Sequence, residues 1–279
     1  MSKQLYKYLE KPAFSWGLAR ISQPKLPLSD VYLESVQGGE GVSVYLVDTG
    51  IDYAHSDLQN QAKLGFDAFG GDGSDELGNG TFLAGIISTI APKAKLYSVK
   101  ILDNQGNGSI EGIIEAIEWI TLNARKPAVV NVAIGIPPND MLDEVIKKSI
   151  DTGIVFVLEG GGSSEDVSKS SPARVREGIV VGASDSSDFM AEFSNFGEGL
   201  DIFAPGVDII SSALGAERSS LSGVQVAGAH VSGVAALHLS VNPHLTPLQV
   251  KEKLISDSVV GALKNVPEGT PNRLLQIGY

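Results

Sequence analysis

Short apolar runs alternate with segments of helical periodicity along most of the chain. The runs are rich in Val, Ile and Leu, and each is bounded by turn-forming residues, which is typical of buried strands. They lie at 42–47, 95–101, 128–134, 154–158, 178–183 and 202–206. Strands that are apolar on both faces are characteristic of parallel sheets covered by helices. The pattern therefore predicts an α/β fold with a mostly parallel central sheet and helices on both faces.

Helical signals separate these runs. Ser109 can cap a helix whose isoleucines recur at helical spacing, and 141–151 has an amphipathic pattern. Segment 228–241 is rich in small apolar residues and predicts a buried helix. Pro247 stands in the first turn of a last predicted helix. The sequence contains no internal repeat and no linker, so we predict one domain.

Composition narrows the function classes. The chain has 279 residues, of which 43% are hydrophobic and 19% charged, as in soluble globular proteins. Its net charge of −12 argues against a nucleic-acid partner, because phosphate binding needs clustered Lys and Arg. The chain has no cysteine, which fits a reducing compartment. We see neither an apolar stretch of signal-peptide length at the N-terminus nor a run of ~18 apolar residues. These features predict a cytoplasmic protein without a membrane partner; a trimmed vacuolar or secreted form is the alternative.

Three motifs follow one another in a fixed order. Asp48-Thr49-Gly50 ends a predicted strand, Gly78-Asn79-Gly80-Thr81 opens a helix, and Ser222-Gly223 precedes another helix near the end of the chain. This order resembles that of subtilisin-like (S8) serine proteases. The segments 16–22, 193–197 and 201–206 resemble the proteinase K and cerevisin-like fungal branch. The resemblance covers 14–279 and implies the three-layer subtilase fold, with 1–279 as a single domain and 1–13 as an N-terminal extension.

The same resemblance places other residues where the catalytic groups belong. Phe82 stands at the position of the general-base histidine, Gln225 at that of the nucleophilic serine and Gly162 at that of the oxyanion-hole asparagine. Only Asp48 is kept. A serine needs an imidazole to take its proton and donors to stabilise the oxyanion. Asn79 matches a non-catalytic histidine and cannot act as the base. We therefore predict a pseudoprotease with no serine protease activity.

The peptide-binding parts resemble those of the family more closely. Segments 106–108 and 133–135 resemble the two edges against which subtilases lay an extended substrate, which would bind by strand addition. Alternatively, their glycines only provide conformations that the loops need. The residues predicted to bind a peptide or small molecule are Phe82, Gln225, Gly162, Asn79, Gly106, Asn107, Gly108, Ala133, Ile134 and Gly135.

Two carboxylates are candidates for chemistry. Glu159 falls where relatives keep a small residue lining the main specificity pocket. It can fill that pocket, bind a cationic group, act as an acid or base, or pair with a nearby Lys or Arg. Asp48 can accept hydrogen bonds from the Thr49-Gly50 turn or from Gln225, or act as a general base with a pKa raised by burial.

The leading hypothesis is a binding protein that uses the former cleft. The alternative is a repurposed enzyme, such as an isomerase or cyclase, in which Asp48 and Glu159 are acid and base and Phe82 and Gln225 position the substrate. A purely structural or regulatory subunit is a third reading. We expect no cofactor other than a possible structural calcium, because Asp201 matches a calcium position of proteinase K-like relatives.

Overall fold

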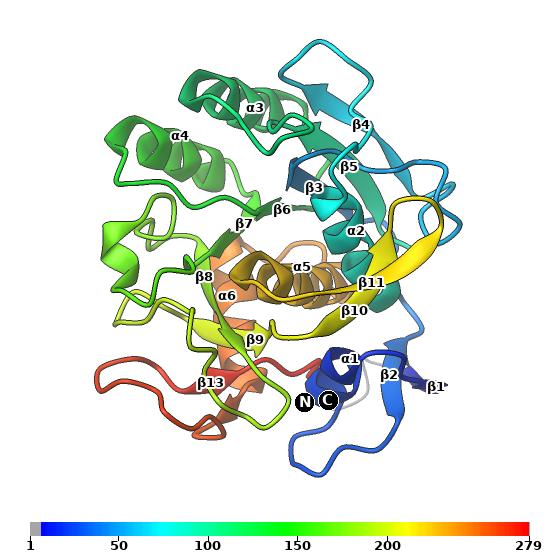
Figure 1. Ribbon diagram of the computed structural model, residues 1–279, viewed down its shortest axis with the longest axis vertical. Coiled ribbons are helices and arrows are strands. Elements are labelled where there is room, and N and C mark those ends of the chain that lie inside the picture. Colours follow the sequence, from blue (N-terminus) through cyan, green and yellow to red (C-terminus); the bar gives the residue numbers. More distant parts are fainter. Residues whose placement is uncertain (1–6, 279) are drawn as a thin grey trace.

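A nine-stranded sheet forms the centre of the computed structural model, which describes residues 7–278 (Figure 1). Its strands run in the order β12-β13-β9-β8-β7-β6-β3-β5-β4. They are β3 (Ser43–Asp48), β4 (Ala62–Asp67), β5 (Lys95–Lys100), β6 (Ala128–Val132), β7 (Val155–Glu159), β8 (Ile179–Ser184), β9 (Ile202–Pro205), β12 (Val259–Val260) and β13 (Arg273–Leu274). Every neighbouring pair is parallel except β12 and β13. This confirms the predicted mostly parallel sheet.

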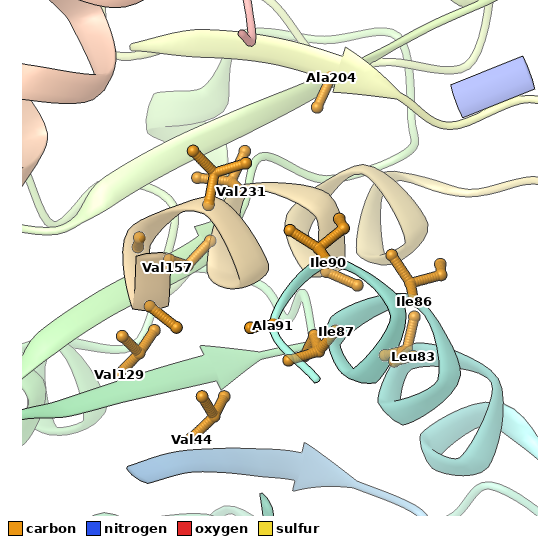
Figure 2. Close-up of a cluster of buried hydrophobic side chains, with 14 of the residues drawn as sticks. Val44, Leu83, Ile86, Ile87, Ile90, Ala91, Val129, Val157, Ala204 and Val231 are labelled. Atoms are coloured by element: carbon orange, nitrogen blue, oxygen red, sulfur yellow. The ribbon is translucent and has the colours of Figure 1, made fainter. Parts of the chain in front are cut away.

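Helices cover both faces of this sheet because successive strand residues point to opposite sides. In β3, Val44 and Leu46 join one hydrophobic core, and Tyr45 and Val47 join the other. The helices α2 (Asn79–Ile90), α5 (Val224–Val241) and α6 (Pro247–Asp257) contribute to the first core, and α3 (Ile110–Asn123) and α4 (Asp140–Asp151) to the second. Figure 2 shows the first core, where side chains of α2 and α5 meet those of the strands. The predicted three-layer α/β fold is confirmed.

The helix ends follow their local sequence. Ser109 Oγ accepts a hydrogen bond from the Gly112 amide at 3.0 Å, which confirms the predicted cap of α3. Thr246 and Gln249 form a reciprocal capping box at the start of α6. Helix α5 begins at Val224, four residues before the predicted start at 228, so the expected segment is longer than its small-residue pattern indicated.

Helix α5 also corrects the reading of the chain's apolar segments. Over Val224–Val241 its mean hydropathy is 1.3, so by length and composition alone it is apolar enough to cross a bilayer. The prediction that the chain holds no such run is therefore wrong for this segment. In the structure 83% of this window is buried inside the fold, between the sheet and α2. Its apolar composition is explained by its place as a core helix.

Several elements lie outside the predicted set. Helix α1 (Trp16–Ser22), a short 3-10 helix (Val167–Lys169) and two small antiparallel sheets complete the fold. One sheet pairs β1 (Tyr8–Pro12) with β2 (Val31–Ser35), and the other is a hairpin of β10 (Ile209–Ala213) and β11 (Glu217–Leu221). Residues 1–6 of the predicted extension 1–13 lie outside the described part of the chain. The remainder packs on the fold, since the Tyr8 hydroxyl donates to the Gly278 carbonyl at 2.7 Å.

Candidate functional site

Two of the predicted site residues, Asp48 and Glu159, lie at the carboxyl edge of the parallel sheet. Asp48 ends β3 and Glu159 ends β7, so both carboxylates lie at this edge. Strand β3 lies between β5 and β6, and therefore the segments 106–108 and 133–135, which follow β5 and β6, flank Asp48. The crevice at the carboxyl ends of the strands is where open α/β sheets bind ligands.

Asp48 is buried and held by the main chain. It is 2% exposed, and its Oδ1 accepts a hydrogen bond from the Thr49 amide at 2.5 Å. Burial raises the pKa of Asp48 to about 7, while the Thr49 hydrogen bond and the charge of Lys100 oppose this shift. Lys100 is itself buried and donates to the Thr49 carbonyl. The structure thus supplies the turn contact expected for a structural role of Asp48.

Asp75 fixes the start of α2 and was missed from the sequence. Its Oδ1 accepts hydrogen bonds from the Thr49 hydroxyl at 2.8 Å and the Gly78 amide at 2.8 Å, and its Oδ2 accepts from the Thr81 amide at 2.8 Å. An aspartate just before a glycine-led helix start is a capping signal that could have identified it. This network ties the Asp48-Thr49 turn to the helix that carries Asn79 and Phe82.

Phe82 does not line an open site. The side chain is 1% exposed and belongs to the hydrophobic core beneath the sheet's first face. The structure therefore does not support the prediction that Phe82 binds a ligand. The physical reason is that a fully apolar ring gains more from burial in the core than from lining a wet cleft. Asn79, one turn earlier in α2, is only partly buried.

Gln225 lies in the first turn of α5, and its side chain packs against Gly223, which immediately precedes the helix. A Cβ placed at Gly223 would lie 2.3 Å from Gln225 Oε1, so the amide covers this glycine. The Gln225 side chain forms no hydrogen bond with any residue between 7 and 278, and the predicted bond to Asp48 is not present. Gly162 is exposed, and a Cβ there would meet no atom within 4 Å.

Glu159 lines a pocket of about 350 Å³. Backbone of Gly135, Gly161 and Gly162 forms part of its wall, whereas Asp48, Phe82 and Gln225 do not line it. Glu159 Oε1 lies 3.0 Å from the position that a Cβ at Gly135 would take, so the carboxylate packs closely against this glycine. The pocket brings Glu159 together with Gly135 and Gly162 and is separate from Phe82 and Gln225.

The Glu159 carboxylate lacks a cationic partner. Within residues 7–278 it forms neither a hydrogen bond nor an ion pair, and Lys169, which lines the same pocket, pairs with Glu165 at 3.9 Å. Burial raises the pKa of Glu159 to about 8, and the charge of Asp48 adds to this shift. The reading in which Glu159 simply pairs with a Lys or Arg does not describe the structure.

The two edge segments carry free backbone groups. In the described part of the chain, the amides and carbonyls of Gly108, Ile134 and Gly135 take part in no hydrogen bond. The loop before Gly108 is held by Asp103, whose Oδ1 accepts from the amides of Gln105 at 2.8 Å and Asn107 at 2.9 Å. Unpaired backbone groups on a rigid loop are what strand addition requires.

None of the chain's four histidines hydrogen-bonds to Asp48. His55 Nε2 lies 3.2 Å from the Glu217 carbonyl, and His230 Nδ1 lies 3.0 Å from the Val226 carbonyl. His238 lies 3.7 Å from Asp257. Burial lowers the pKa of both His230 and His238 to about 4, which keeps these imidazoles neutral inside α5. They serve the packing of the fold.

Asp201, the expected calcium ligand, already has a cationic partner. Its Oδ2 lies 2.7 Å from Lys251 Nζ and accepts a hydrogen bond from the Val180 amide at 2.9 Å. Within residues 7–278 no group of three or more His, Cys, Asp or Glu side chains is arranged to hold a metal ion.

Comparison with known proteins identifies the scaffold on which this site is built. The subtilase family model matches residues 39–278. The chain belongs to the subtilase family. A solved cold-adapted subtilisin-like serine proteinase superimposes with a TM-score of 0.93 at 36% identity, covering 96% of this chain and 100% of that one.

Curated relatives come from bacteria and fungi. An extracellular serine proteinase of Thermus sp. (strain Rt41A) is 38% identical over 96% of this chain and 67% of its own length. A subtilase-type proteinase of Schizosaccharomyces pombe is also 38% identical, over 95% of this chain and 62% of its own length. Alkaline serine exoprotease A of Vibrio alginolyticus is 36% identical over 93% of this chain, which spans 49% of that protein. The family is shown, while the narrower fungal branch stays a prediction.

The two raised carboxyl pKa values predict how stability depends on pH. Between the unfolded pKa values near 4 and the folded values of about 7 for Asp48 and about 8 for Glu159, the folded protein binds more protons than the unfolded chain. The free energy of unfolding therefore falls as pH rises through this window. We expect Glu159→Gln to lose less stability than wild type between pH 5 and pH 9, by roughly 1–2 kcal/mol after allowing for partial exposure.

Urea unfolding at pH 5, 7 and 9 measures this difference. Glu118→Gln, which removes an exposed charge from α3, controls for the change in net charge. Parallel pH profiles for wild type and Glu159→Gln would contradict the burial of an ionisable Glu159.

Proposed function

We propose that this subtilase is a non-proteolytic binding protein that holds an extended peptide in the former substrate cleft. Two features together support the proposal: the catalytic residues of the family are replaced, and backbone groups of the two edge segments form no hydrogen bond within the described residues. Phe82 and Gln225 replace the base and the nucleophile, while the backbone groups of Gly108, Ile134 and Gly135 remain unpaired. The relatives are named as proteinases, and their activity is not carried over to a chain that lacks its chemical groups.

The pocket beside the cleft favours a cationic side chain. Glu159 presents a carboxylate with no ion-pair partner in the described chain to a pocket with glycine-backbone walls. A Lys or Arg side chain that enters this pocket would form an ion pair with the Glu159 carboxylate. Charge-assisted hydrogen bonds are the strong ones in such surroundings. We therefore expect a peptide with Lys or Arg at the residue that occupies this pocket.

Fluorescence polarisation with matched peptides tests the preference of the pocket for a cationic side chain. Wild type should bind a Lys-containing peptide about 10-fold more tightly than the same peptide with norleucine, and Glu159→Gln should remove this preference. Because the cation binds the ionised carboxylate, the preference should grow from pH 6 to pH 9, through the Glu159 pKa of about 8.

Backbone recognition is tested separately from the pocket. Methylating the peptide amides that would pair with the edge segments removes their donors, and should weaken binding at least about 10-fold in both wild type and Glu159→Gln. A peptide library with no member bound, or binding unaffected by amide methylation, would count against strand addition. If the ligand is a small molecule, no peptide of the library should bind.

A second function is supported by the two carboxyl pKa values. Values of about 7 for Asp48 and about 8 for Glu159 lie near neutral pH, as acid–base catalysis requires. If Asp48 and Glu159 act as acid and base, the protein is a repurposed isomerase or cyclase. The geometry supports it less, since Asp48 is 2% exposed and does not line the Glu159 pocket. Loss of a turnover in Asp48→Asn and Glu159→Gln, with melting temperatures near wild type, would favour this enzyme over the binding protein.

A further inference from the structure

Three oxygen atoms surround the ammonium group of Lys251. The Arg176 and Gly178 carbonyls each accept from Nζ at 2.9 Å, and Asp201 Oδ2 lies 2.7 Å from the same atom. A lysine ammonium has three donors, and all three find an acceptor here. The distances are those of charge-assisted hydrogen bonds.

These oxygens come from separate parts of the fold. Lys251 lies in α6, Arg176 and Gly178 lie in the turn before β8, and Asp201 precedes β9. The Lys251 and Asp201 side chains are each only 14% exposed. The ammonium therefore joins a helix to the ends of two strands, in a place that is largely shielded from water.

The oxygen set does not suit a bound calcium ion while Lys251 is present. Calcium takes six to eight oxygen ligands at 2.3–2.6 Å. Here two carbonyls and a carboxylate, a set that would suit such a hard cation, point at an ammonium, and its charge repels a second cation. We propose that Lys251 is a tethered cation that takes the place of an ion at this site, so that the fold is stable without calcium and carries a latent cation site beneath the lysine.

The position of Lys251 is set by its helix. The capping box at Thr246 and Gln249 fixes the start of α6, and buried Val250 and Leu254 seat the helix on the core. Asp201 needs the ammonium, because burial raises the pKa of this carboxyl and the charge of Lys251 opposes the rise. Removing the ammonium leaves a shielded carboxylate and two carbonyls without their donor.

Thermal unfolding of four proteins in millimolar CaCl2 and in EDTA tests the proposal. Wild type should melt at the same temperature in both buffers. Lys251→Ala should melt roughly 5–15 °C lower in EDTA and regain part of the loss in CaCl2, since the truncated side chain leaves room for the ion. Lys251→Met fills that room without a charge, and Lys251→Ala with Asp201→Asn lacks the carboxylate, so neither should respond to CaCl2.

The outcomes separate cleanly. A fall in wild-type melting temperature in EDTA overturns the proposal, as does a Lys251→Ala protein whose melting temperature is the same in both buffers. If Lys251→Ala does not fold in EDTA, its refolding yield in CaCl2 replaces the melting temperature as the readout. An equal rescue of all three variants would also overturn it, because the ion would then act elsewhere.

Discussion

Wild-type protein incubated with a fluorogenic peptide will show no hydrolysis above the uncatalysed rate, and a serine-directed phosphonate will label no residue. Removing either the serine or the histidine from a subtilisin-type triad lowers kcat about 10⁶-fold, and we propose that Gln225 and Phe82 replace both in this chain. Gln225 has no hydroxyl, and Phe82 has no nitrogen to accept a proton. Mass spectrometry after phosphonate treatment and a long incubation with casein measure the two results.

Single reversion gives a matched control. Gln225→Ser alone should stay inactive, because a hydroxyl without a base remains a poor nucleophile. Adding Phe82→His and Gly162→Asn introduces an imidazole, at a position buried in the core, and an amide donor, which the open space at Gly162 accepts. The extracellular serine proteinase of Thermus sp. (strain Rt41A) is the positive control for substrate and probe. A labelled hydroxyl in wild type, together with casein degradation, would contradict the proposed loss of the triad.

The fold could be predicted because a strand that is buried on both faces has a continuous apolar sequence, which is easy to detect. Val44 and Tyr45 point into different cores, and both are apolar, so β3 is a continuous apolar run. The hairpin of β10 and β11 left no such mark, since Glu217–Leu221 is exposed along its whole length. Without an apolar face, a strand has no hydrophobic period to detect.

The location of a site residue could be predicted only where its place on the main chain fixes it. Glu159 ends a buried strand, so its place at the carboxyl edge followed from the strand itself. The orientation of the Phe82 side chain could not be predicted from the sequence. An apolar residue in the first turn of a helix can line a cleft or pack in the core. Lys251 was missed for a similar reason: a lysine on an amphipathic helix is usually solvated, and the three oxygens that it binds lie far from it in the sequence.

Conversion of Arg20 to Ala is expected to lower the free energy of unfolding by about 3–5 kcal/mol. Arg20, in α1, is fully buried, and its guanidinium binds Asp188 through two contacts, Nε to Oδ1 at 2.7 Å and Nη2 to Oδ2 at 3.1 Å. Nη1 also donates to the Gln23 carbonyl at 2.7 Å. Removing the guanidinium leaves the Asp188 carboxylate buried without its counter-charge, and that uncompensated charge is the source of the loss.

Urea unfolding of three proteins distinguishes this mechanism from loss of packing alone. Arg20→Met with Asp188→Leu removes both charges and keeps apolar volume, so it should be less destabilised than Arg20→Ala. Lys148→Ala breaks an exposed pair, in which Nζ lies 3.7 Å from Glu144, and should change stability by less than about 1 kcal/mol. If Arg20→Ala unfolds at the same urea concentration as Lys148→Ala, the buried pair does not hold α1 to the segment after β8. If the double variant is as unstable as Arg20→Ala, packing rather than charge accounts for the loss.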